Sequence, residues 1–226
     1  MAQFDGFPTE TTEFLRRLSE NNSKAWFDHH RGDYDDYWVE PAKAFVVAAG
    51  AALQEIAPVE AEPRVNGSIF RVNRDVRFST DKRPYKDYLD FWFWEGERRS
   101  AVSGFYLRIT PDGVGIGVGA HHFDRDRLAS YRSAVTDSAS ATSLHAAVGA
   151  IERAKFEVKG EHYKTLPRGF DTDDEFTARM LRHNALWVGE DEPAPKVLGS
   201  KRFVAWAIAR WSKMEPLHRW LVDQLD

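Results

Sequence analysis

A chain of 226 residues, 42% of them hydrophobic and 13% aromatic, is long and apolar enough to bury a sizeable core, which excludes a disordered protein. The absence of cysteine excludes disulfides, thiolate metal sites and cysteine nucleophiles. The net charge of −4 argues against a general nucleic-acid coating protein, although a local basic groove is compatible with it.

No proline-, glycine- or serine-rich linker divides the chain, so we predict a single domain over residues 1–226. The N-terminal residues lack the basic and apolar regions of a signal peptide, and no segment has the length of a membrane span. We therefore predict a cytoplasmic protein with no membrane partner. The oligomeric state is left open.

The first third of the chain is predicted to be helical. Apolar residues at helical spacing indicate one helix over residues 8–21, a short helix capped by Ser23, and a third over residues 34–56 with an interruption at Pro41. His29 and His30 lie near several aspartates, but their spacing fits no established set of metal ligands. We predict no metal site.

The middle third is predicted to form strands. Aromatic residues occupy both faces of residues 88–94, and residues 103–110 and 114–119 read as a hairpin around Pro111-Asp112-Gly113. Gly115, Gly117 and Gly119 share one face of the last strand, so they do not form the turn that a dinucleotide requires. No cofactor is predicted, and the bare glycine face indicates close approach of a helix or a flat ligand.

The last third returns to helix. We predict a helix capped by Asp124, a second helix beginning at Ser138 or Ser140, and a short edge strand over residues 155–158. A loop over residues 163–170 and a helix over residues 171–186 follow, and then an acidic connection over residues 190–195. The chain ends with a helix capped by Ser200 and a final helix with Pro216 in its first turn. The predicted fold is α+β, an antiparallel sheet of about four to six strands packed with N-terminal and C-terminal helices.

Residues 64–86 carry seven basic residues against two acidic ones, a local charge of +5. From Arg71 to Phe78 charged and apolar residues alternate, as in a strand whose successive side chains point to opposite faces. Such a strand would place Arg71, Asn73, Asp75 and Arg77 in one row.

In that row Asp75 would orient Arg71 and Arg77 and leave some of their N–H donors free for phosphate, sulfate or carboxylate. Pro84 indicates that the residues after Asp81 form a loop that presents its last two residues. We predict an anion-binding or phosphate-binding site. Its ligand residues are Arg71, Arg74, Asp75, Arg77, Lys82, Tyr85 and Lys86.

Two other interpretations stay open. The basic row and the aromatic residues from Tyr85 to Trp94 are also compatible with a nucleic-acid-binding module, against which the net acidity speaks. Alternatively, Arg71, Asp75 and Arg77 form a purely structural network with no ligand. The sequence identifies no nucleophile, so whether the protein is an enzyme is left open.

The motif Arg71-Val-Asn-Arg-Asp-Val-Arg-Phe78, followed by Asp81-Lys-Arg-Pro-Tyr-Lys86, resembles the signature of a widespread bacterial family, domain of unknown function 2461. Shorter matches at residues 21–22, 26–27, 104–106, 155–157 and 166–170 extend the resemblance over essentially the whole chain. It implies a shared fold and a focal site at the Arg-rich motif, and it implies no reaction.

Because the resemblance extends to the loop predicted over residues 163–170, Lys164 and Arg168 are second-rank candidates for the same anion site. His122 is a further candidate, because an imidazole can act as an acid or a base near neutral pH.

Overall fold

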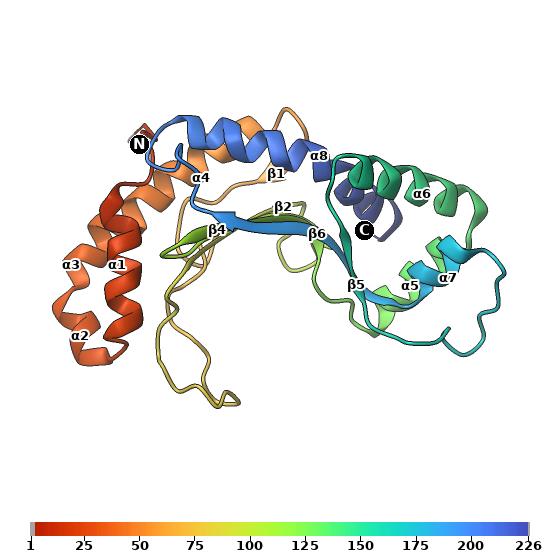
Figure 1. Cartoon of the computed structure of the whole chain (residues 1–226), viewed down its shortest axis with the longest axis horizontal. Coiled ribbons are helices and arrows are strands. Elements are labelled where there is room, and N and C mark those ends of the chain that lie inside the picture. Colours follow the sequence, from red (N-terminus) through yellow and green to blue (C-terminus); the bar gives the residue numbers. More distant parts are fainter. Residues whose placement is uncertain (1–2, 226) are drawn as a thin grey trace. The chain divides into compact units, whose positions relative to one another are not determined.

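The computed structural model describes residues 3–225. It confirms the α+β class, with a six-stranded antiparallel sheet in the order β1-β2-β3-β4-β6-β5 (Figure 1). The strands are β1 (Val59–Glu60), β2 (Leu89–Glu95), β3 (Gly104–Ile109), β4 (Gly113–Ala120), β5 (Val158–Glu161) and β6 (His183–Pro193). The helices are α1 (Thr9–Glu20), α2 (Lys24–His29), α3 (Arg31–Tyr34), the π-helix η1 (Asp35–Val39), α4 (Glu40–Leu53), α5 (Arg125–Thr136), α6 (Ser138–Arg153), α7 (Glu175–Leu181) and α8 (Arg202–Leu225).

Contacts group these residues into two compact units. Unit 1 comprises the chain up to Phe93, Tyr106–Ile116 and Asp191–Ala209. Unit 2 comprises Trp94–Phe105, Gly117–Glu190 and the chain from Arg210 on. The prediction of a single domain stays a prediction. No helix within residues 3–225 combines the length and the apolar character that crossing a membrane requires.

Buried aromatic rings form the core of unit 1. The ring centroid of Phe45 on α4 lies 4.8 Å from that of Phe91 on β2 and 5.4 Å from that of Phe7. Phe203 at the start of α8 lies 5.8 Å from Phe7. Helices from both ends of the chain therefore pack on one face of the sheet, as the sequence predicts.

The N-terminal helices begin and end close to their predicted limits. Ser23 caps α2 by accepting a hydrogen bond from the backbone N–H of Trp26. The predicted interruption at Pro41 is wrong, because Pro41 occupies the first turn of α4, where no intrahelical N–H bond is required of it. The irregularity comes earlier, in the π-helical turn η1.

The predicted hairpin is confirmed as β3 and β4. Thr110 closes its turn, since its backbone N–H donates to the carbonyl of Gly113 at 2.9 Å. Along β4 the glycines, which lack a side chain, allow the neighbouring strand β6 to approach closely. A Cβ at Gly115 would lie 2.5 Å from Asp191 Oδ1 of β6, so a β6 side chain covers that position, where a helix or a ligand was predicted.

In unit 2, Asp124 and Asp137 cap α5 and α6 with their carboxylates. The predicted helix over residues 171–186 is wrong beyond Leu181, because residues 183–193 form β6. The acidic connection predicted over residues 190–195 is therefore mostly strand. Residues 185–188 are the apolar run of β6, and pairing with β5 overrides their helical spacing.

The break predicted at Pro216 is also wrong, because Pro216 lies inside the single helix α8. Trp211, Met214, Leu217 and Leu221 are fully buried at helical spacing on both sides of it. Burying four such side chains stabilises the helix by about 1.5–3 kcal/mol each, which exceeds the roughly 3 kcal/mol that an internal proline costs.

Candidate functional site

The Arg-rich motif lies in a long irregular segment between β1 and β2, and its tip forms a projecting arm, residues 73–85 (Figure 1). A single antiparallel bridge, Asn73 with Tyr85, closes the base of the arm. The predicted strand from Arg71 to Phe78 is wrong. The backbone N–H of Arg77 donates to the side chain of Asp75, and this local turn competes with a strand.

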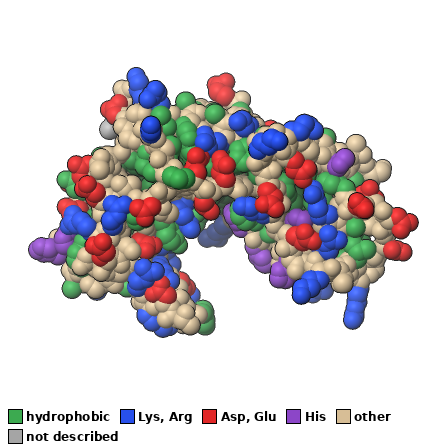
Figure 2. Space-filling model, in the orientation of Figure 1, with side chains coloured by type: hydrophobic (Ala, Val, Ile, Leu, Met, Phe, Trp, Pro, Cys, Tyr) green, Lys and Arg blue, Asp and Glu red, His purple; other side chains and the backbone are tan. Residues whose placement is uncertain are grey.

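The cations of the arm are paired within the arm, and blue and red side chains lie next to one another on it in Figure 2. Arg77 Nη2 lies 2.6 Å from Asp75 Oδ2, and Arg74 Nη1 lies 2.8 Å from Asp81 Oδ2. Lys82 Nζ donates to the carbonyl of Val76 at 3.0 Å. The side-chain hydrogen bond from Arg77 lowers the pKa of Asp75. These groups do not form the predicted open row.

Tyr85 is buried at the base of the arm. Its ring stacks on Phe27 of α2 with centroids 4.3 Å apart. The side-chain amide of Asn22 bonds both backbone groups of Tyr85, accepting from its N–H and donating to its carbonyl, each at 3.0 Å. The predicted ligand residue Tyr85 therefore anchors the arm to the helices of unit 1.

Charged groups converge instead on the sheet beside the arm, around the buried carboxylate of Asp90 on β2. Asp90 Oδ1 accepts from Tyr106 Oη at 2.7 Å and from Arg108 Nε at 2.7 Å. Asp90 Oδ2 accepts from Arg108 Nη2 at 3.1 Å, and Lys86 Nζ lies 3.7 Å from it. We call Asp90, Lys86, Tyr106 and Arg108 the Asp90 centre.

The two strands place these groups together by their alternation. Tyr106 and Arg108 are two residues apart on β3, so they share a face, and Asp90 lies on the same face of β2. Leu89, Phe91 and Leu107 between them are fully buried. The guanidinium carbon of Arg108 lies 3.8 Å from the ring centroid of Tyr88, which fixes the plane of the guanidinium.

Positive charge exceeds negative charge at the Asp90 centre, where two cations share one carboxylate. Burial lowers the pKa of Lys86, and the charges of Arg108 and Arg71 lower it further, while Asp90 opposes this shift. Burial also disfavours the charge of Arg108, but the hydrogen bonds to Asp90 and the charge of Asp90 together outweigh it and raise the pKa of Arg108. The centre is a preorganised cationic site.

The sequence analysis named Lys86 as a ligand residue, but it did not include Asp90, Tyr106 or Arg108 among the ligand residues. A signal was present, because Asp90 is the only charged residue between Tyr88 and Trp94, and Arg108 is the only charged residue of β3. A lone charge within an apolar strand indicates a buried partner on a neighbouring strand. Which strands are neighbours is not encoded in that pattern.

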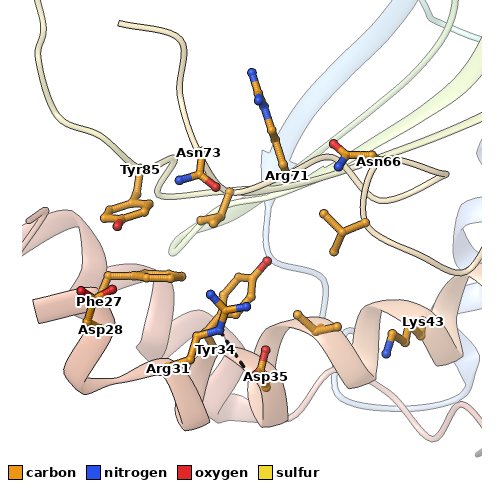
Figure 3. A pocket seen from close by; sticks show the side chains of 13 residues that line it. Phe27, Asp28, Arg31, Tyr34, Asp35, Lys43, Asn66, Arg71, Asn73 and Tyr85 are labelled. Atoms are coloured by element: carbon orange, nitrogen blue, oxygen red, sulfur yellow. Dashed lines mark ion pairs between the residues drawn. The ribbon is translucent and has the colours of Figure 1, made fainter. Parts of the chain in front are cut away.

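The three second-rank predicted residues lie in unit 2. Lys164 and Arg168 are exposed in the loop between β5 and α7, which confirms the predicted loop. His122 is exposed just before α5. Arg71, by contrast, belongs to unit 1, and Figure 3 shows its side chain pointing away from the helices beneath it.

Unit 2 contains a second polar network, which the sequence did not indicate. His218 Nδ1 lies 2.8 Å from Ser103 Oγ, and His218 Nε2 lies 2.9 Å from Glu95 Oε1. Arg219 Nη2 donates to the same glutamate oxygen at 2.8 Å. A serine, a histidine and a carboxylate can form a nucleophilic relay. Ser103 is only 3% exposed and His218 is fully buried, so we interpret the network as structural.

We expect the stability of the protein to fall as the pH drops from about 7 to about 5, in part through His218. Burial lowers the pKa of His218 below 6.5, and hydrogen bonding to Glu95 offsets only part of this effect. The unfolded chain therefore binds more protons in this window, and stability present above the unfolded pKa is lost as the pH falls toward the folded one. The loss per proton is at most about 1.4 kcal/mol per pH unit.

Thermal melting at about pH 7, 6 and 5 measures this effect. His218→Gln should flatten the dependence of Tm on pH, although His183, whose pKa burial also lowers, keeps part of it. His122→Gln is the control, since His122 is exposed. An unchanged slope in His218→Gln would contradict the assignment.

The fold and the site define an α+β protein with a cationic centre held by a buried carboxylate on its sheet. The model of the family described as "Conserved hypothetical protein (DUF2461)" matches residues 10–220, and the chain belongs to this family. This confirms the family resemblance of the sequence. No curated protein and no solved structure matches the chain.

Proposed function

We propose that the protein binds a small anion, a phosphate or a carboxylate, at the Asp90 centre. The observation that carries the proposal is the convergence of Lys86 and Arg108 on one buried carboxylate. Arg71 adds a third positive charge, close enough to lower the pKa of Lys86. An anion would offset this excess charge.

The hydrogen-bond donors of the centre support the same proposal. Arg108 uses Nε and Nη2 on Asp90, which leaves its Nη1 without a protein acceptor among the described residues. Lys86 Nζ is 3.7 Å from the nearest carboxylate oxygen, beyond hydrogen-bond length. Both side chains are partly exposed, Arg108 by 35% and Lys86 by 17%, so solvent and ligand have access to them.

The proposal keeps Arg71 and Lys86 from the predicted set and adds Arg108, with Asp90 and Tyr106 holding the cations in place. Arg74, Arg77 and Lys82 are second-rank, because each of them already bonds a carboxylate or a carbonyl of the arm. Tyr85 acts by anchoring the arm.

Thermal melting tests the proposed anion binding, and it compares phosphate, sulfate, citrate and chloride at matched ionic strength. A ligand at about 100 times its Kd adds roughly 2.7 kcal/mol, a rise in Tm of about 5–10 °C for a protein of this size. We expect phosphate or citrate, but not chloride, to raise Tm. Lys86→Met should abolish the rise. Arg16→Ala, which removes one exposed cation of unit 1, should keep it.

The other outcomes separate the competing interpretations. No rise with any anion, or an equal rise in Lys86→Met, contradicts the proposal. Loss of the rise in Arg77→Ala would move the site to the arm. Tight binding of a short single-stranded oligonucleotide that weakens steeply with salt would favour the nucleic-acid module.

A further inference from the structure

Unit 1 contains a cavity of about 620 Å³ that none of the four residues of the Asp90 centre lines. Figure 3 shows helices α2, α3 and α4 as its floor and the segment carrying Asn66, Arg71 and Asn73 as its roof. Its volume is in the range of sites for small organic molecules. The irregular turn η1 forms part of the floor, and such π-helical turns recur at functional sites.

Tyr34 is the side chain that marks this cavity as a binding site. It is only 5% exposed, and among the described residues its hydroxyl has no hydrogen-bond partner. Figure 3 shows the hydroxyl pointing from the floor toward the roof, into the cavity. The hydroxyl faces the open space of the cavity, so it can donate a hydrogen bond to an acceptor group of a ligand there.

The neighbours of Tyr34 hold its ring rigidly. The ring stacks on Trp38 at a centroid distance of 4.9 Å and contacts Phe27 at 5.1 Å. Burial raises the pKa of Tyr34 to about 12, so the hydroxyl is a donor at neutral pH. The guanidinium carbon of Arg31 lies 5.1 Å from the ring centroid, which places a second donor beside the first.

The other charged groups of the cavity favour an acidic ligand. Asp28 is paired with Lys24, and Asp35 is held by Arg31 at 3.5 Å, a loose contact that a ligand can share. Neither carboxylate therefore calls for a cationic ligand. Val39, Val65 and Val72 supply apolar walls.

From this geometry we infer that the cavity binds a small organic carboxylic acid. Its carboxylate accepts hydrogen bonds from Tyr34 and Arg31, and its apolar or aromatic body lies against the valines. The cavity shares Arg71 with the proposed anion site, but Tyr34 and Arg31 do not belong to that site, so the inference does not depend on the proposed function.

Titration calorimetry and thermal melting with benzoate test the inference. At about 10 mM, roughly ten times a millimolar Kd, benzoate should raise Tm. Benzamide, which has the same shape and no charge, should bind more weakly. Tyr34→Phe removes one oxygen atom and should weaken benzoate binding about tenfold while the variant stays folded.

Two variants make the result specific. Tyr37→Phe removes a hydroxyl from the neighbouring turn η1, where Tyr37 does not line the cavity, and should bind benzoate as the wild type does. Lys86→Met should also keep benzoate binding, which separates this cavity from the Asp90 centre. The inference is overturned if benzoate fails to bind, if Tyr34→Phe binds it equally well, or if benzamide binds as tightly.

Discussion

Asp90→Asn should lower Tm by about 6–12 °C. The substitution keeps the shape of the side chain and removes the charge that Arg108 and Lys86 face, and Tyr106 donates to the same group. Removing one member of a buried ion pair costs about 3–5 kcal/mol. Because Arg108 is 35% exposed and screened by solvent, we expect the lower end of that range, and each kcal/mol shifts Tm by about 2–4 °C at this size.

Asp75→Asn is the matched control in thermal and urea unfolding. It makes the same chemical change in an ion pair of the arm, where Asp75 and Arg77 are exposed to solvent. Its Tm should stay close to that of the wild type. If the two variants melt alike, the Asp90 centre does not hold the sheet, and the preorganisation on which the proposed anion site rests is lost.

Tyr85→Ala should lower Tm by about 6–20 °C and expose the arm to proteolysis. Tyr85 is 6% exposed and stacks on Phe27, and replacing a buried aromatic ring with alanine costs about 3–5 kcal/mol. With the anchor lost, the bonds between Asn22 and the backbone of Tyr85 should open more often. Limited proteolysis followed by mass spectrometry locates the cut.

Phe78→Ala provides the comparison within the same arm. Phe78 is 94% exposed, so removing its ring should leave both Tm and the cleavage rate unchanged. Wild-type stability of Tyr85→Ala would contradict its role as an anchor and would return Tyr85 to the set of predicted ligand contacts. If Tyr85→Ala lost anion binding without losing stability, Tyr85 would likewise be a ligand contact and not an anchor.

Asp90→Asn and Tyr85→Ala also test what holds Lys86 in position, since Lys86 follows Tyr85 directly in the chain. The backbone N–H of Lys86 donates to the carbonyl of Val72 at 2.8 Å, so Lys86 is held where the arm meets the sheet. Anchoring the arm through Tyr85 and holding the charge through Asp90 therefore fix the same ammonium group from two sides. We expect either substitution to weaken the anion binding proposed for this centre.

Elements that depend on neighbours in the chain were predictable. The cap at Ser23, the cap at Asp124 and the turn at Thr110 act over two to four residues, and all are present. The aromatic strand β2 was also predictable, because its apolar residues occupy both faces and such a strand is stable only inside a sheet.

Errors arose where a distant contact outweighed a local preference. Residues 183–193 form β6 because a partner strand accepts their backbone bonds, and the chain passes through Pro216 as helix because buried side chains flank it. In the Arg-rich motif, by contrast, local hydrogen bonds decided the structure. Its alternating charges predicted a strand, but each aspartate bonded an arginine two residues away, and no neighbouring strand competed with these short turns.

The sequence by itself determined the family, the α+β class and the region of excess positive charge, because composition, periodicity and local charge are properties of neighbouring residues. Tertiary structure alone decided which cations stay available. It paired Arg74 with Asp81 on the other side of the arm, and it brought Arg108 from a different strand to Asp90 beside Lys86. The physical reason is that the availability of a charge depends on its nearest opposite charge in space, and strand pairing sets that neighbour.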